Sequence, residues 1–120
     1  MDPFTETASE LSSLTNTQLE TLRLYLSIKK GEINLNNALG RSENRRISRG
    51  THYRILGQAR KNIKRSLFTV AIAVQLGLVK PEDVQKLISS VSMVPTSLDE
   101  DQAREVMGIL RLLADRIVMP

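Results

Sequence analysis

Four side chains near the middle of the sequence form the pattern with the clearest chemistry. They recur at positions i, i+4, i+7 and i+11, on one face of a helix, and they are Arg54, Gln58, Lys61 and Arg65. Arginine and lysine side chains pair with guanine O6 and N7, and a glutamine or asparagine amide pairs with adenine N6 and N7. The same cations attract phosphates. The stripe therefore predicts recognition of a nucleic acid rather than bond-breaking chemistry.

The segment around this stripe carries most of the positive charge of the chain. Residues 41–65 contain nine bases and a single acid, Glu43, for a net charge of +8, within a chain whose formal net charge is +4. An ordinary surface helix mixes both signs of charge, yet no acid occurs between Thr51 and Leu76. A block of one sign is the electrostatic footprint of a protein that binds a polyanion.

Composition excludes several other classes of function. The 120 residues include no cysteine and one histidine, so disulfides, a cysteine nucleophile and a histidine-rich zinc site are ruled out. We find no paired carboxylates, no nucleophile beside a base and no glycine-rich phosphate loop. We therefore expect no enzyme activity, no catalytic residues, no metal and no cofactor, and we infer no small-molecule ligand. Aromatic residues are only 3 %, which argues against a stacking platform for single strands.

Hydropathy predicts a protein of the cytoplasm and not of a membrane, and the basic segment predicts that it is associated with the nucleoid. The longest apolar stretch, residues 67–79, is shorter than a membrane span. The N-terminus has acids and no apolar core, so it does not resemble a signal peptide.

Helical periodicity dominates, and no segment alternates with period two, so we expect an all-α fold. The expected helices cover about residues 17–30, 33–39, 51–77, 81–95 and 97–118. Capping boxes are predicted at Thr17–Glu20 and Ser97–Glu100, and Pro81 with two following acids predicts a third helix start.

Two phrases lie on either side of the basic linker. Ala38-Leu39-Gly40-Arg41-Ser42 is similar to the end of a second helix, and Ser48–Arg54 is similar to the start of a recognition helix. Through these phrases residues 17–65 resemble a generic helix-turn-helix of bacterial or archaeal transcription regulators. The resemblance implies that a helix over 51–65 enters the major groove of DNA. The connection from Gly40 to Thr51 is longer than the usual turn of about 3–4 residues, so residues 41–50 are expected either to contain a short helical turn or to lie on DNA.

The candidate nucleic-acid-binding residues come from the basic linker and from the helix that follows it. Linker arginines are expected to contact phosphates or the minor groove. His52 and Tyr53 could contact phosphates, although a lone histidine is also often a packing or capping residue. The full set is Arg41, Arg45, Arg46, Arg49, Thr51, His52, Tyr53, Arg54, Gln58, Lys61, Asn62 and Arg65.

The C-terminal half predicts a homodimer. Residues 66–79 are almost entirely apolar, and a helix that is apolar all round is expected to be buried on all sides. Further along, a heptad spacing predicts a dimer interface at Val106, Leu110, Leu113 and Ile117. The alternative is packing of this seam within one chain, against residues 84–91.

Together these patterns predict an N-terminal arm or short helix (1–16), a helix-turn-helix-like DNA-binding region (17–66) and a helical core and dimerisation region (67–120). The function they favour is sequence-specific binding of double-stranded DNA by a small homodimeric transcription regulator. Two alternatives stay open: a nucleoid-associated or DNA-partition protein with little sequence preference, and an RNA-binding or ribosome-associated protein.

Overall fold

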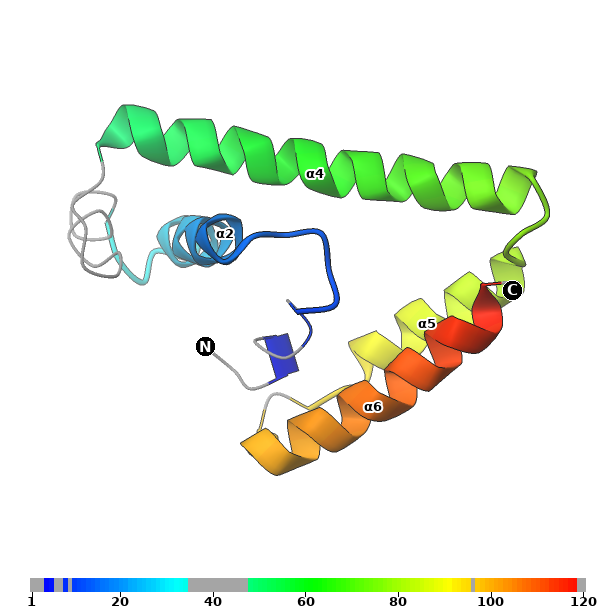
Figure 1. Ribbon diagram of the computed structural model, residues 1–120. Helices are drawn as coiled ribbons and strands as arrows, with labels where there is room; N and C mark the ends of the chain where they lie inside the picture. Colours follow the sequence, from blue (N-terminus) through cyan, green and yellow to red (C-terminus); the bar gives the residue numbers. More distant parts are fainter. Residues whose placement is uncertain (1–3, 6–7, 9, 35–47, 96, 119–120) are drawn as a thin grey trace. The chain divides into compact units, whose positions relative to one another are not determined.

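The computed structural model describes residues 4–5, 8, 10–34, 48–95 and 97–118. Over these residues the fold is all-α, as predicted, and contains no strand. Its helices are α2 (Asn16–Lys29), α4 (Arg49–Gln75), α5 (Pro81–Ser92) and α6 (Glu100–Ile117) (Figure 1). The helix predicted over 33–39 lies outside the described residues from position 35 onwards.

The chain divides into two compact units. One comprises residues 13–65, and the other comprises residues 1–12 together with 66–120. Helix α4 belongs to both, because its 27 residues run without a break from Arg49 to Gln75. The helix starts two residues earlier than Thr51, where the sequence predicted it to begin.

Helix α2 begins at a capping box two residues before the predicted one. The Thr15 hydroxyl accepts a hydrogen bond from the Gln18 backbone N–H (3.1 Å), and the Gln18 side chain accepts one from the Thr15 N–H (3.2 Å). The prediction of Thr17–Glu20 was therefore wrong in register. Leu14 and the buried Leu19 take the positions of a hydrophobic staple around the earlier box, which the later box lacks.

Helix α6 also begins at a different capping box from the one predicted. The Asp99 carboxylate accepts from the Gln102 N–H (2.8 Å), and the Gln102 side chain accepts from the Asp99 N–H (3.2 Å). The predicted box at Ser97–Glu100 is wrong, because Glu100 and Asp101 already lie in the first turn, where acids offset the helix dipole. Helix α5 starts at Pro81 with two acids in its first turn, as predicted.

Two glycines end helices by adopting a left-handed backbone. Gly31 has φ of 77° and Gly77 has φ of 79°, a region that other residues enter at a cost. After each helix the next N–H groups turn back to bond carbonyls of the last turn, as in Glu32 to Ser27 and Leu78 to Ala73. These turns satisfy carbonyls that would otherwise lack a partner.

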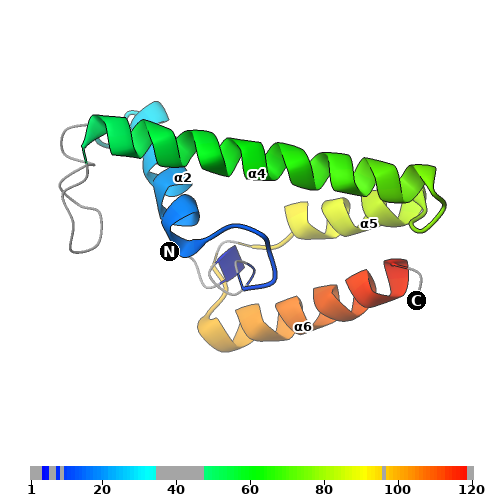
Figure 2. The same ribbon diagram turned by 45° about the horizontal axis from the view of Figure 1, so that its top comes forward.

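Each unit has a small core. In residues 13–65 the buried side chains are Leu19, Thr21, His52, Ile55, Leu56 and Ala59. In the other unit α5 and α6 pack side by side as a helical hairpin (Figure 2). Its buried side chains are Val79, Ala103, Met107, Leu110 and Ile117.

The heptad seam of α6 therefore has a role inside a single chain. Leu110 and Ile117 are buried, and Val106 and Leu113 are half-buried, without any second copy. This burial favours the intramolecular alternative for the four residues that the heptad spacing assigned to a dimer interface.

Replacement of Leu110 by alanine should lower the free energy of unfolding by about 2–5 kcal/mol, because it leaves a cavity in the hairpin. Leu112→Ala is the matched control, since Leu112 lies on the same helix but is 63 % exposed, against 9 % for Leu110. The control should change stability by less than about 0.5 kcal/mol. Urea unfolding followed by circular dichroism measures both, and equal losses would contradict the burial of Leu110.

Candidate nucleic-acid interface

The first half of α4 has a buried side and a charged side. Ile55, Leu56 and Ala59 are buried, whereas the four predicted donors of the stripe are exposed. The helical spacing alone predicts that this apolar side continues through Ile63 to Leu67. That prediction is wrong, because Ile63 is 41 % and Leu67 65 % exposed. The buried stripe stops at Ala59, so the helix leaves the core about two turns earlier than its apolar spacing predicts.

Three of the stripe residues line one hollow with two amides. The hollow has a volume of about 350 Å³ and is lined by Gln18 of α2 and by Gln58, Lys61, Asn62 and Arg65 of α4. Two of these side chains are cations and three are amides, and none is an acid. Such a lining offers donors to a phosphate oxygen or to the acceptor atoms of a base edge.

Gln18 was not predicted as a site residue. Its sequence position marks it only as part of a helix cap, and it joins the hollow because α2 runs across the first half of α4 (Figures 1 and 2). Its carbonyl oxygen accepts from the Thr15 N–H and from Asn62. These two hydrogen bonds fix the orientation of the Gln18 side chain in the hollow, and with it the direction of its amide N–H donors.

Asn62 joins α4 to the start of α2. Its Nδ2 donates to the Ser13 carbonyl (2.7 Å) and to Gln18 Oε1 (3.0 Å), and its Oδ1 accepts from the Ser13 hydroxyl (2.7 Å). The side chain is half-buried. These bonds occupy the atoms with which an asparagine would read adenine, so Asn62 positions the hollow rather than offering a free amide.

The start of α4 uses two polar residues in a cap. The Ser48 hydroxyl accepts from the Thr51 N–H (3.1 Å) and donates to the Thr51 hydroxyl (3.0 Å). Thr51, a predicted binding residue, is therefore half-buried within this cap. Arg49 and Arg54 are exposed on the first turns, and Arg41, Arg45 and Arg46 lie outside the described residues.

His52 and Tyr53 face different surroundings although they are neighbours. Only 1 % of His52 is exposed, whereas 58 % of Tyr53 is. Their rings meet edge to face, with centroids 5.3 Å apart. Tyr53 is thus accessible to a ligand, and His52 is an interior residue.

One basic residue of the segment, Arg60, contacts another part of its own unit. The Arg60 guanidinium lies 5.0 Å from the centre of the Tyr25 ring on α2, within the range of a cation–π interaction, and Lys29 lies 5.9 Å from the same ring. Arg60 is therefore off the stripe and helps to hold α2, although it adds to the positive charge of the surface.

Acid should weaken the fold through His52. Burial lowers the pKa of its imidazole below the ordinary value of 6.5, and no described residue gives its Nδ1 a hydrogen bond. The unfolded chain consequently takes up a proton at a higher pH than the folded chain does. The folded state therefore has its full stability above about pH 6.5, where the histidine is neutral in both states. The free energy of unfolding then falls progressively as the pH drops below that value.

Melting temperatures of the wild type and of His52→Gln between pH 7.5 and 5 measure this effect. The variant lacks the titrating group, so its melting temperature should fall less steeply over this interval. Equal slopes for the two proteins would contradict the neutral, buried histidine.

Comparison with known proteins gives no relative from which a function could be inferred, so the inference depends on the residues described above. No family model, no curated protein and no solved structure matches the chain. Among the described residues no group of three His, Asp or Glu side chains is placed to hold a metal ion. None of the described helices has the length and apolar character needed to cross a membrane.

Proposed function

We propose that this protein binds double-stranded DNA in a sequence-specific manner, as a small homodimeric transcription regulator. In this proposal the first half of α4 enters the major groove and the basic linker 41–50 lies on the phosphate backbone. The observation that carries it is the exposed stripe of Arg54, Gln58, Lys61 and Arg65, opposite a buried stripe, on a helix of 27 residues without an acid.

The geometry of a helix suits this groove. The major groove of B-form DNA is about 12 Å wide and admits an α-helix, whose side chains then reach the base edges. The cations of the stripe supply phosphate contacts, and Arg54 and Gln58 supply donors that distinguish bases. Gln58 is the stripe's uncharged reader, and its presence among cations favours a regulator over a protein that only coats DNA.

DNA is favoured over RNA for two reasons. The major groove of A-form RNA is too deep and narrow for side chains to read. Sequence-specific RNA binding commonly stacks exposed bases on aromatic rings, and the sequence has only four phenylalanine and tyrosine residues and no tryptophan. The strongly exposed ones on α4 are Tyr53 and Phe68, one beyond each end of the stripe. The helix-turn-helix arrangement itself stays a prediction, because most of its second helix lies outside the described residues.

The second half of α4, together with the turn that follows it, supports assembly with a second copy. Leu67, Phe68, Ile72 and Leu76 are 59–70 % exposed, and no charged residue occurs between Ser66 and Val79. Water is a poor environment for a helix that is apolar all round. We therefore assign the dimer interface to this surface instead of to the α6 seam, much of which is already buried in one chain.

Two properties of this surface fit a copy of itself. Phe68, Ile72 and Leu76 follow i, i+4, i+8 and form a ridge, with the small Ala71 beside it. Ridges of this spacing interlock with one another in the commonest class of helix packing. An uncharged surface also brings no like charges together across a two-fold axis.

The ridge supplies part of the area that a dimer needs. Residues 67–78 include six exposed large apolar side chains, namely Leu67, Phe68, Val70, Ile72, Leu76 and Leu78. At about 100° per residue Leu67 and Val70 lie on another face than the ridge, so the three ridge side chains bury on the order of 300 Å² per copy, against about 800 Å² per partner in a standard interface. Because the basic and apolar halves are one helix, such a dimer carries two basic halves, as a palindromic site requires.

Binding to DNA should depend steeply on salt and on individual stripe residues. If about five phosphates are neutralised per protomer, the logarithm of the association constant should fall against the logarithm of salt concentration with a slope of roughly −4.5. Gln58→Ala should relax preference at single base pairs by about 1–3 kcal/mol, because it removes a base contact. Fluorescence anisotropy with an enriched genomic site and with a random duplex measures both.

Arg54→Ala and Arg60→Ala provide a matched pair, since each removes one arginine from α4. Arg54→Ala should reduce both affinity and sequence preference, whereas Arg60→Ala should leave the preference unchanged. A flat salt response would refute the polyanion interface. Equal affinity for all duplexes would favour a DNA-coating protein, and tighter binding of duplex RNA would favour the RNA-binding alternative.

Light scattering at micromolar concentration should give the mass of two chains. Ile72→Glu should give one folded chain, because it places a charge in the proposed interface, and it should raise the dimer dissociation constant by roughly 100-fold. Leu112→Glu is the control, with a leucine of similar exposure on α6. Since the chain has no cysteine, Ile72→Cys and Leu112→Cys can also be compared by disulfide cross-linking. A wild type of one chain's mass, or dissociation by Leu112→Glu alone, would overturn this assignment.

A further inference from the structure

We propose that the pocket between the N-terminal residues and the α5–α6 hairpin binds a small amphipathic monocarboxylate. Its hydrocarbon part lies among the apolar side chains of the pocket, and its carboxylate pairs with Arg111. The inference does not rest on DNA binding, because the pocket lies wholly within the unit of residues 1–12 and 66–120.

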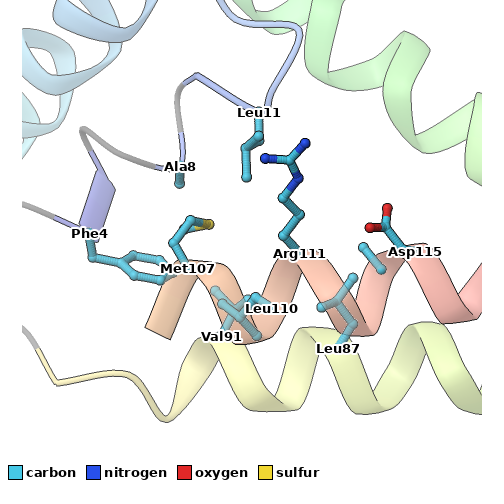
Figure 3. Close-up of a pocket in the computed structure, with 10 residues that line it drawn as sticks. Phe4, Ala8, Leu11, Leu87, Val91, Met107, Leu110, Arg111 and Asp115 are labelled. Atoms are coloured by element: carbon cyan, nitrogen blue, oxygen red, sulfur yellow. The ribbon is translucent and has the colours of Figure 1, made fainter. Parts of the chain in front are cut away.

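The pocket is lined mainly by apolar side chains from three parts of that unit. Phe4 and Leu11 come from the N-terminal residues, Leu87 and Val91 from α5, and Met107 and Leu110 from α6 (Figure 3). Its volume is about 410 Å³. This value falls within the range of about 300–1,000 Å³ that is typical of small-molecule sites.

The pocket is open to solvent on one side, and at about 30 Å³ per molecule it has room for on the order of a dozen waters. Its mainly apolar lining offers few polar partners to the waters that touch it. Displacing such waters with a hydrocarbon chain is favourable, because apolar surface leaves water on both the ligand and the protein. A saturated chain of about ten carbon atoms, at roughly 30 Å³ per carbon as for a water molecule, occupies a volume comparable with that of the pocket.

Two charged side chains stand at the pocket, and they do not pair with each other. Arg111 and Asp115 are one turn apart on α6, and both project to the same side of the helix as the N-terminal residues (Figure 3). Within the described part of the chain the ion pair that satisfies the distance criterion is a different one on α6, Arg104 with Glu100 at 3.3 Å. Among the described residues the Arg111 guanidinium therefore has no carboxylate partner, and it lies at the edge of the apolar pocket.

This combination selects the class of ligand. A planar guanidinium matches a carboxylate with two parallel hydrogen bonds. Asp115 adds a negative charge nearby, which disfavours a dianionic phosphate and therefore favours a single carboxylate. A helix from a protein partner is about 10–12 Å across with its side chains, too wide for a pocket of this volume.

Decanoate, used below its micelle-forming concentration, is the probe for this site. Isothermal titration of the 120-residue chain should show saturable binding of one decanoate per chain. Arg111→Gln should weaken it by about 10–100-fold, since it removes one charge-assisted contact. Arg104→Gln, which removes an arginine from the same helix outside the pocket, should leave the affinity unchanged. Ala114→Leu, which fills part of the pocket, should weaken decanoate and decanol alike.

Decanol and decyltrimethylammonium have the same ten-carbon tail as decanoate and test which head group the site prefers. Decanol should bind more weakly than decanoate and should be insensitive to Arg111→Gln. No saturable binding of decanoate, equal affinity of the wild type and Arg111→Gln, or equal losses in Arg111→Gln and Arg104→Gln would each overturn the proposal. Tighter binding of decyltrimethylammonium than of decanoate would also overturn it, because Asp115 would then determine the ligand charge.

Discussion

The burial of one short stripe of α4 is the constraint on which the unit of residues 13–65 depends. His52, Ile55, Leu56 and Ala59 are withdrawn from water, and this fixes the rotation of the helix about its own axis. The opposite side must then face solvent, and it is the side that carries the cations. In a chain this small a few buried side chains decide which donors a ligand meets.

Polar contacts add to the packing of the apolar stripe in holding α4 against α2. Asn62 bonds to Ser13 and Gln18, and Arg60 lies over the ring of Tyr25, so both tie α4 to α2. Each uses a residue type that is also common in nucleic-acid contacts. A basic, amide-rich helix can therefore use some of its polar side chains to contact its own fold. The remaining donors are better oriented, because fewer conformations are open to them.

Helix α4 changes character where its charge ends. Up to Arg65 it alternates buried and cationic sides, and from Ser66 it is uncharged and largely exposed in a single chain. The α5–α6 hairpin meanwhile buries much of its own seam. The exposed apolar surface of α4 and the apolar pocket beside the hairpin are therefore separate features. The occupants we propose for them differ because a long surface suits a second helix and a concave pocket suits a small molecule.

The all-α class, the helix starts at Pro81 and near Thr51, and the exposure of the four-residue stripe follow from local spacing, because periodicity and caps act over a few residues. Tertiary structure decided the rest. The heptad pattern of α6 is the same whether the helix packs on α5 or on another chain, and only the position of α5 shows that Leu110 is covered within a single chain. The sequence likewise presents Asn62 as one more donor and Gln18 as a cap residue. Their roles come from the crossing of α2 and α4, which brings together residues 44 positions apart. Contacts at such separation depend on how helices pack, and no local pattern encodes them.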